Sequence, residues 1–263
     1  MVQSNYPQPP SETLPTMYDL PSEDPEEPGL PDEFHLLQPQ LLRDTCRPAT
    51  YDLYDLNEVF IGTDLNLYYE VRHPRWYKRP DWFLVLGVRR ARQQTDLRWS
   101  YVIWQEGVAP FLAIELLSPG TEADDLGQSL REVNQPPSKW QVYEQILRIP
   151  YYGVFDRYQN RFQLFELQGV RYEAVPLPEA RFWFEPLGLG LGVWQGDYQG
   201  TTGAWLRWYD AEHHWLPTPE EQAEQERQRA EQERQRAEQE RQRAERLEAR
   251  LRALGIDPDG LDG

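Results

Sequence analysis

The run from Phe111 to Leu117 constrains the fold of this chain more than any other segment, because it is apolar except for Glu115. Its length and its content of Leu, Ile and Phe are typical of a buried strand. An ionised carboxylate in such a strand costs several kcal/mol unless it is paired, solvated or bound to a metal. By the two-residue period of a strand, Glu115 shares a face with Ala113 and Leu117. The fold must therefore supply a partner for Glu115, and an arginine on a neighbouring strand is one candidate.

Asp81 is a second carboxylate at a point where a strand is expected to begin. Pro80 and Asp81 precede a Val- and Leu-rich run from Trp82 to Val88, and proline is tolerated at the first position of a strand. If the two strands are neighbours, the carboxylates of Asp81 and Glu115 converge. Two carboxylates with water and substrate oxygens are a usual magnesium site. A Pro-Asp pair is also a common turn, so the metal site and a simple turn are both open.

Lys139 is unusual for this chain, because only two of its 27 Lys and Arg residues are lysines. The surrounding sequence predicts a helix from Ser138 to about Arg148, with Ser138 and Gln141 in capping-box spacing. A cation in the first turn is opposed by the helix macrodipole at a cost of about a few tenths of a kcal/mol. Tyr143 lies four residues on and shares the face of Lys139, where it could contact a phosphate or simply pack. A solvent-facing Lys139 is the alternative.

These segments, in this order, resemble the Uma-type putative restriction endonuclease family of the PD-(D/E)XK nuclease superfamily. The resemblance covers roughly residues 52 to 210, and it rests on Pro80-Asp81, on Ile114 to Pro119, on Lys139 with Tyr143, and on Tyr151 to Asp156. It implies an α/β fold with a restriction-endonuclease-like core, in which helices flank a central mixed sheet. The implied function is metal-dependent hydrolysis of phosphodiester bonds in nucleic acid, with DNA as the expected substrate.

The resemblance also implies roles for individual residues. Asp81 and Glu115 would bind Mg²⁺ or Mn²⁺, with the backbone carbonyl of Leu116 as a third ligand. The superfamily motif has a lysine two residues after the glutamate, where this chain has Leu117. Lys139 would therefore supply the catalytic ammonium from the helix.

The segment before that helix holds two adjacent aspartates, Asp124 and Asp125. One of them is either a further metal ligand or a cap for its loop. We favour the cap and keep Asp125, with Tyr143, as an accessory residue of the site.

The net charge of −17 argues against a nucleic-acid partner at first sight, because phosphate binding needs local positive charge. Residues 1–64 hold 13 acidic and 2 basic residues (net −11), however, whereas residues 65–219 hold 18 and 16 (net −2). From residue 72 to residue 98 the chain is locally basic. The residues expected there to contact nucleic acid are Arg72, Arg75, Lys78, Arg79, Arg89 and Arg90. A solvated loop and strand edge is the alternative.

The composition divides the chain into four segments. We expect a disordered, acidic, proline-rich leader over residues 1–48 and a PD-(D/E)XK-like nuclease domain over residues 49–217. From Ala223 a seven-residue unit repeats, which predicts a long charged helix over residues 218–254, followed by a tail over residues 255–263. With alanine at heptad position a, glutamate falls at position d. A weakly self-associating coiled coil and a solvated single helix are therefore both open.

No apolar run approaches the roughly 20 residues needed to cross a bilayer, so we expect no membrane partner. Cys46 is the only cysteine, which excludes an internal disulfide and fits a cytoplasmic location. Two readings compete with a magnesium-dependent hydrolase. One is a catalytically inactive binding module of the same nuclease fold, and the other is an adaptor that acts through the C-terminal helix.

Overall fold

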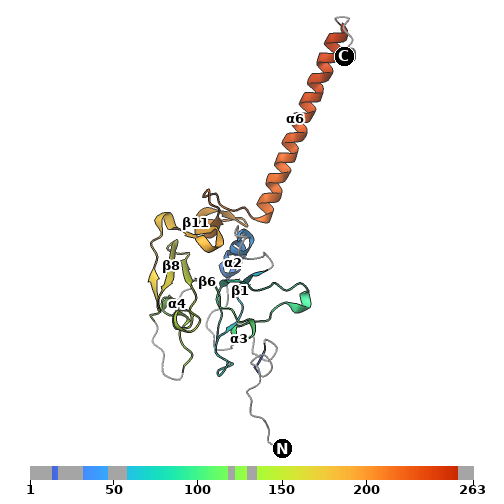
Figure 1. Cartoon of the computed structure of the whole chain (residues 1–263). Helices are drawn as coiled ribbons and strands as arrows, with labels where there is room; N and C mark the ends of the chain where they lie inside the picture. Colours follow the sequence, from blue (N-terminus) through green and yellow to red (C-terminus); the bar gives the residue numbers. More distant parts are fainter. Residues whose placement is uncertain (1–13, 17–31, 47–57, 118–121, 129–134, 254–263) are drawn as a thin grey trace, which may run out of the picture. The chain divides into compact units, whose positions relative to one another are not determined.

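The computed structural model describes residues 14–16, 32–46, 58–117, 122–128 and 135–253 (Figure 1). The chain divides into two compact units, Met1–Leu216 and Pro217–Gly263. The strands are β1 (Val59–Thr63), β2 (Leu67–Tyr68), β3 (Tyr77–Lys78), β4 (Trp82–Leu86), β5 (Tyr101–Val102), β6 (Leu112–Leu116), β7 (Tyr151–Asp156), β8 (Arg161–Gln168), β9 (Arg171–Ala174), β10 (Arg181–Phe184), β11 (Leu189–Tyr198) and β12 (Thr201–Tyr209). The helices and short helical turns are α2 (Glu33–Thr45), η2 (Gln94–Asp96), α3 (Ile103–Glu106), α4 (Glu122–Asp125), α5 (Lys139–Gln141), η3 (Val142–Ile146), η4 (Pro178–Ala180), η5 (Glu185–Leu187) and α6 (Pro219–Ala253). Within the described ranges, no helix is long and apolar enough to cross a membrane.

A six-stranded mixed sheet forms the centre of the first unit, with the strand order β1-β4-β6-β7-β8-β9. Strands β6 and β7 run parallel, and the other neighbouring pairs are antiparallel. The prediction that the two strands carrying the carboxylates are neighbours is confirmed, because Trp82 of β4 is paired with Ile114 of β6. Every residue of β6 is buried, as its apolar sequence predicts.

Both faces of this sheet are covered, which places β6 in the middle of the core. On one face, Ile114 and Leu116 belong to a buried cluster that includes Leu42 of α2 and Trp208 of the β10-β11-β12 sheet. On the other face, a second cluster contains Ala113 of β6 and the following Leu117, together with Val142 of η3. A third small sheet has the order β3-β2-β5. The predicted α/β class, with a central mixed sheet flanked by helices, is confirmed.

Helix α2 corrects the expectation that residues 1–48 form a disordered, acidic, proline-rich leader. The helix begins after Asp32, whose side chain accepts the backbone N–H of His35 at 3.1 Å and so caps the first turn. Leu41 and Leu42 on this helix are fully buried. A high proline content disfavours helix, so the composition of this segment did not predict α2. One proline, Pro39, lies inside the helix. Residues 1–13 and 17–31 of the expected leader lie outside the described residues.

Gln38 fixes α2 to the rest of the first unit. It is fully buried, and its side-chain amide donates to the carbonyl of Leu206 at 2.9 Å and accepts the N–H of Leu206 at 2.8 Å. The side-chain amide of Gln38 thus makes the two hydrogen bonds with Leu206 of β12 that the backbone of a neighbouring strand would otherwise make. It thereby sets the position of the residues one turn earlier in α2, including His35.

Helix α6 confirms the long charged helix that the heptad repeat predicts. Its start is capped by Thr218 and Glu221, since the Thr218 hydroxyl accepts the Glu221 N–H at 3.2 Å and the Glu221 carboxylate accepts the Thr218 N–H at 2.8 Å. The helix runs for 35 residues and has no buried residue. Self-association through this helix stays a prediction, and the tail over residues 255–263 lies outside the described residues.

Candidate active site

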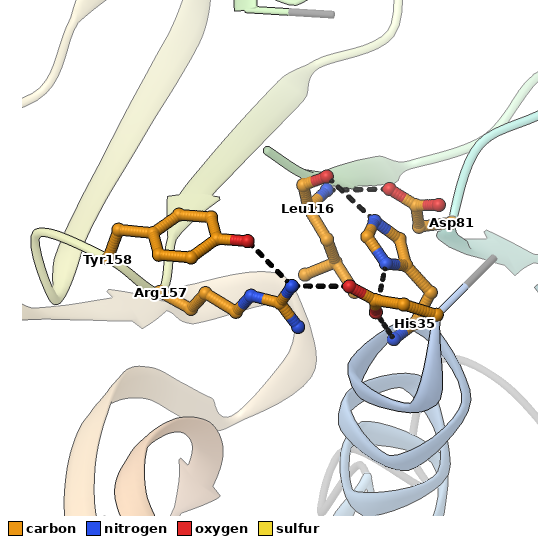
Figure 2. Close-up of polar contacts among 6 residues, drawn as sticks. His35, Asp81, Leu116, Arg157 and Tyr158 are labelled. Carbon is orange, nitrogen blue, oxygen red and sulfur yellow. Dashed lines mark hydrogen bonds and ion pairs between the residues drawn. The ribbon is translucent and has the colours of Figure 1, made fainter. Parts of the chain in front are cut away.

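Pro80 stops the pairing of β4 with β6 just before Leu116. Trp82 pairs with Ile114, so the continued antiparallel register would place Pro80 opposite Leu116. Proline has no N–H to donate to the Leu116 carbonyl, and the ladder ends. The side chain of Asp81 takes over instead, and its Oδ2 accepts the Leu116 N–H at 2.6 Å (Figure 2). The sequence Pro80-Asp81 thus leaves the Leu116 carbonyl outside the sheet ladder, at the edge where Asp81 lies.

Glu115 is fully buried, and both of its carboxylate oxygens accept hydrogen bonds. The Tyr143 hydroxyl donates to Oε1 at 2.8 Å, and Lys139 Nζ donates to Oε2 at 3.1 Å. The side chain lies on the face of β6 that carries Ala113 and Leu117, as the strand period predicts. The partner that the buried carboxylate requires therefore comes from α5 and η3, and it is not an arginine on a neighbouring strand.

The capping box predicted at the start of α5 positions Lys139. The Ser138 hydroxyl accepts the Gln141 N–H at 3.2 Å, and the Gln141 side chain accepts the Ser138 N–H at 3.1 Å. The helix continues as the π-helical turn η3, a feature that is frequent at functional sites. The Lys139 side chain is 19 % exposed, so its ammonium lies at the border between the core and solvent.

Asp125 belongs to the same cluster as Glu115 and Lys139. It is the last residue of α4 and is 1 % exposed. Its Oδ1 lies 2.9 Å from Lys139 Nζ. Its backbone carbonyl accepts the Tyr152 hydroxyl at 2.9 Å, which anchors α4 to β7. Asp125 therefore shares the ammonium of Lys139 with Glu115.

The site holds three carboxylates and one ammonium, and burial dominates its electrostatics. Burial raises the pKa of Glu115 well above its usual value, with Lys139 opposing the shift and Asp81 and Asp125 adding to it. Burial also raises the pKa of Asp81, against the opposing effects of Lys139 and the Leu116 N–H. Burial alone would lower the pKa of Lys139, but the surrounding carboxylates outweigh it and hold that pKa well above its usual value. This excess of negative charge is what a divalent cation would neutralise.

The donor atoms at this site fit a divalent metal ion. The carboxylates of Asp81 and Glu115 and the carbonyl of Leu116 are hard oxygen donors, the type that Mg²⁺ prefers. In the conformation of the described residues, no three His, Cys, Asp or Glu side chains stand together as a metal-binding group. Ligation would therefore rest on two side chains and one main-chain oxygen, with water and substrate completing the coordination, as is usual for Mg²⁺.

His35 is a residue of this region that the sequence did not reveal. Its Nε2 lies 3.0 Å from the Leu116 carbonyl oxygen, although the two residues are 81 positions apart (Figure 2). Its Nδ1 lies 2.7 Å from Oδ1 of Asp32. The signal in the sequence was Asp32 as a helix N-cap before a leucine-containing segment. That signal indicates a helix, but it gives no indication of the contact with Leu116.

Most of the basic residues expected to contact nucleic acid have partners within the protein. The ion pairs join Arg72 to Glu70, Arg79 to Asp64 and Arg89 to Glu58, with N–O distances of 2.9, 2.6 and 3.3 Å. Arg90 donates to the carbonyl of Val59 at 2.6 Å, and Arg75 is exposed. Lys78 is only 9 % exposed, so it is the least suited of the six to present its charge to a ligand.

Comparison with protein families identifies the chain. A family model, Uma2, described as "Putative restriction endonuclease", matches residues 6–197. The chain belongs to the Uma2 family. The match includes helix α2 and all the residues of the carboxylate and lysine cluster, and it confirms the resemblance inferred from the sequence. The Uma2 description places the protein among restriction-endonuclease-like nucleases.

Comparison with solved structures gives a weaker likeness. The chain is similar to a crystal structure described as "a putative nuclease belonging to DUF820 from Anabaena variabilis ATCC 29413". The sequence identity is 13 % and the TM-score 0.37, over 60 % of this chain and 76 % of that chain. No curated protein matches the chain.

Proposed function

We propose that this Uma2 protein is a metal-dependent endonuclease that hydrolyses phosphodiester bonds of DNA, with Mg²⁺ or Mn²⁺ as its cofactor. The observation that carries the proposal is the 3.1 Å ion pair between Lys139 and Glu115. It joins the ammonium to a buried carboxylate whose neighbour, Leu116, binds Asp81 through its N–H. Two carboxylates, a main-chain carbonyl and a lysine thus gather in one place.

Asp81, Glu115 and the Leu116 carbonyl would hold the metal ion. When bound, such an ion lowers the pKa of a coordinated water and offsets the negative charge of the phosphate. Because burial raises the pKa of Asp81 and of Glu115, these carboxyls bind the cation in competition with protons. Metal binding should therefore strengthen as the pH rises.

Lys139 acts as a hydrogen-bond donor in this proposal and not as a base. Its pKa is held well above the usual lysine value by the neighbouring carboxylates, so the ammonium keeps its protons at neutral pH. Burial and the charge of Glu115 likewise raise the pKa of Tyr143 well above its usual value, so its hydroxyl also stays protonated. Tyr143 holds the Glu115 carboxylate in place, and Lys139 stabilises the negative charge that develops on the phosphate.

The basic segment would contact the nucleic-acid backbone. Arg75, Arg89 and Arg90 lie on the exposed surface, where backbone phosphates can compete with their present partners. Such contacts release counterions, so binding should weaken as the salt concentration rises.

Cleavage of supercoiled plasmid tests the proposal. The full chain is assayed with Mg²⁺, with Mn²⁺ and with a chelator, beside Glu115→Ala and the control Glu238→Ala in α6. We expect nicking that depends on the metal, and a loss on the order of a hundredfold or more in Glu115→Ala alone. Equal cleavage by the two variants would assign the activity to a contaminant or to other residues.

One observation favours a second candidate, a catalytically inactive binding module. Both oxygens of Glu115 are already bound within the protein, so the cluster could serve only to brace the sheet. Calorimetric titration with Mg²⁺ separates the two candidates. The enzyme predicts binding that Asp81→Asn abolishes, and the absence of such binding would favour the module.

A further inference from the structure

A cavity of about 440 Å³ lies beside the start of α2, outside the cluster of Asp81, Glu115 and Lys139. Its volume is within the range of about 300–1,000 Å³ that is usual for small-molecule sites. It is lined by the start of α2, by the turn between β7 and β8 and by the first half of β12. The lining residues with aromatic, charged or amide side chains nearest the opening of the argument are Asp32, Glu33, Phe34, Arg157, Tyr158 and Asn160. The hydrolysis proposed above does not use this cavity.

Arg157 and Tyr158 give the cavity a surface on which a planar ring can stack. The Arg157 guanidinium lies 4.8 Å from the centre of the Tyr158 ring and 4.8 Å from the centre of the Phe34 ring. It also donates to the Tyr158 hydroxyl at 2.8 Å (Figure 2). Tyr158 is 63 % exposed even though its hydroxyl is held in this way. Exposed aromatic rings and guanidinium planes are the surfaces on which proteins stack the bases of nucleic acids.

The charge of the cavity favours a neutral occupant over a phosphate. Arg157 is the one cation among the described residues that line it, and its charge is already paired with Asp32. Together with the exposed Glu33, the lining therefore carries a net charge of −1, which opposes a phosphate. A nucleobase is neutral, and the Glu33 carboxylate and the Asn160 amide can accept hydrogen bonds from its N–H groups.

A continuous row of polar contacts joins the cavity to the proposed metal site (Figure 2). His35 Nε2 lies 3.0 Å from the carbonyl oxygen of Leu116, whose N–H is bound by Asp81. On the other side, Asp32 contacts both His35 and Arg157. Leu116 is the last residue of β6, and Arg157 directly follows β7, which runs parallel to β6. The carboxyl ends of such strands are where ligands bind in α/β sheets, so one nucleic-acid strand can reach both places.

We propose that this cavity binds one unpaired base of the nucleic-acid substrate, beside the phosphodiester bond that is cut, and that the protein consequently prefers single-stranded DNA to intact duplex. This inference rests on the proposed nuclease function, whose metal site would hold the phosphate. A base inside a duplex is stacked on both faces and paired at its edge. Its extrusion costs free energy, whereas a base in a single strand is already free to stack on Tyr158.

Fluorescence anisotropy with a short labelled DNA oligonucleotide, single-stranded or annealed to its complement, tests this inference. The full chain is used with a chelator, so that the DNA is not cut. A second single strand carries one 2-aminopurine, whose fluorescence falls when it stacks on an aromatic ring. The variants are Tyr158→Ala, Tyr158→Phe, which keeps the ring, and the control Val170→Ala, whose side chain is 66 % exposed in the turn between β8 and β9. Thermal melts verify that each variant is folded.

We expect the natural chain and Val170→Ala to bind the single strand about tenfold or more tightly than the duplex and to quench 2-aminopurine. Tyr158→Ala should bind the single strand about tenfold more weakly and lose the quenching, whereas Tyr158→Phe should retain both. Equal binding of the two DNA forms by the natural chain overturns the inference. Unchanged binding and quenching in a folded Tyr158→Ala overturns it as well.

The plasmid assay separates this result from the proposed function. If nicking still depends on the metal and on Glu115 when the base site fails, the proposed function stands without that site. If the base binds as expected but the natural chain does not nick the plasmid, the proposed function is overturned and the binding of an unpaired base by the cavity stands.

Discussion

The candidate site and helix α6 are both rich in charge, and each contains an ion pair of the same length. Lys139 and Glu115 are 3.1 Å apart with side chains 19 % and 0 % exposed, whereas Arg241 and Glu238 are 3.1 Å apart with side chains 67 % and 47 % exposed. An exposed pair of this kind contributes between about 0 and 1 kcal/mol, because water solvates both charges. A buried charge without its partner costs several kcal/mol. The comparison indicates that solvent exposure, more than the distance between the charged atoms, decides how much an ion pair of this protein contributes to stability.

The largest expected effect comes from removing the cation of each pair. Lys139→Met leaves the buried carboxylates of Glu115 and Asp125 without their ammonium and should lower the free energy of unfolding by about 3–5 kcal/mol. Arg241→Met should change it by less than about 0.5 kcal/mol. Urea unfolding of the metal-free proteins at pH 8 measures both values. Equal effects of the two substitutions would remove the distinction between the two regions.

Glu115 should make the stability of the metal-free protein depend on pH. Because its pKa in the folded protein is raised above the ordinary value of 4.5, the folded chain holds this proton more tightly than the unfolded chain does. The free energy of unfolding should therefore fall as the pH rises from 4.5 towards the raised pKa.

Glu115→Gln should remove this contribution and stabilise the metal-free protein at neutral pH. The amide keeps an acceptor for Lys139, and its N–H can donate to the Tyr143 hydroxyl. Thermal unfolding of both proteins between pH 5 and pH 8 measures the effect. Identical pH dependence in the two proteins would show that burial does not raise the pKa of the Glu115 carboxyl.

The buried, neutral side chain of Gln38 should contribute less to the free energy of unfolding than the buried ion pair does. Gln38→Ala leaves the N–H and the carbonyl of Leu206 buried without partners and should cost about 1–3 kcal/mol. The matched control is Gln235→Ala on α6, where Gln235 only donates to the exposed Glu231, and this change should be close to neutral. A neutral Gln38→Ala in the same urea unfolding assay would mean that α2 does not depend on this contact.

The smallest effect is expected from removing α6. A chain ending at Pro219 should unfold at nearly the same temperature as the full chain, since no residue of α6 is buried. Sedimentation of the two chains tests the predicted self-association at the same time. A marked drop in the unfolding temperature would show that the helix contributes to stability, and equal oligomeric states would remove its role in association.

The sequence was sufficient for the parts of the site that rest on local rules. Glu115 is conspicuous in an apolar strand, Pro80 predicts a strand start, and the Ser138–Gln141 capping box predicts the helix that carries Lys139. The structure agrees with all three. The domain boundaries, the self-association and the cytoplasmic location stay predictions.

The remaining parts depend on contacts that no local pattern reveals. Asp125 forms an ion pair with Lys139, but a long segment separates the two residues in the sequence, so no local pattern predicts this contact. An aspartate in an acidic stretch also resembles an ordinary surface residue. His35 reaches Leu116 from 81 positions away. Its helix, α2, lies in a proline-rich segment whose composition is typical of disorder, and it is stabilised by tertiary contacts such as that of Gln38.

A crystal structure of the protein soaked with Mn²⁺, with the ion located by its anomalous scattering, tests the central claim most directly. The account predicts an anomalous peak within bonding distance of the carboxylates of Asp81 and Glu115 and of the Leu116 carbonyl. It also predicts that Lys139 gives up part of its contact with Glu115 when the ion is present. No peak at saturating Mn²⁺, with Lys139 and Tyr143 still bound to both Glu115 oxygens, would contradict the account.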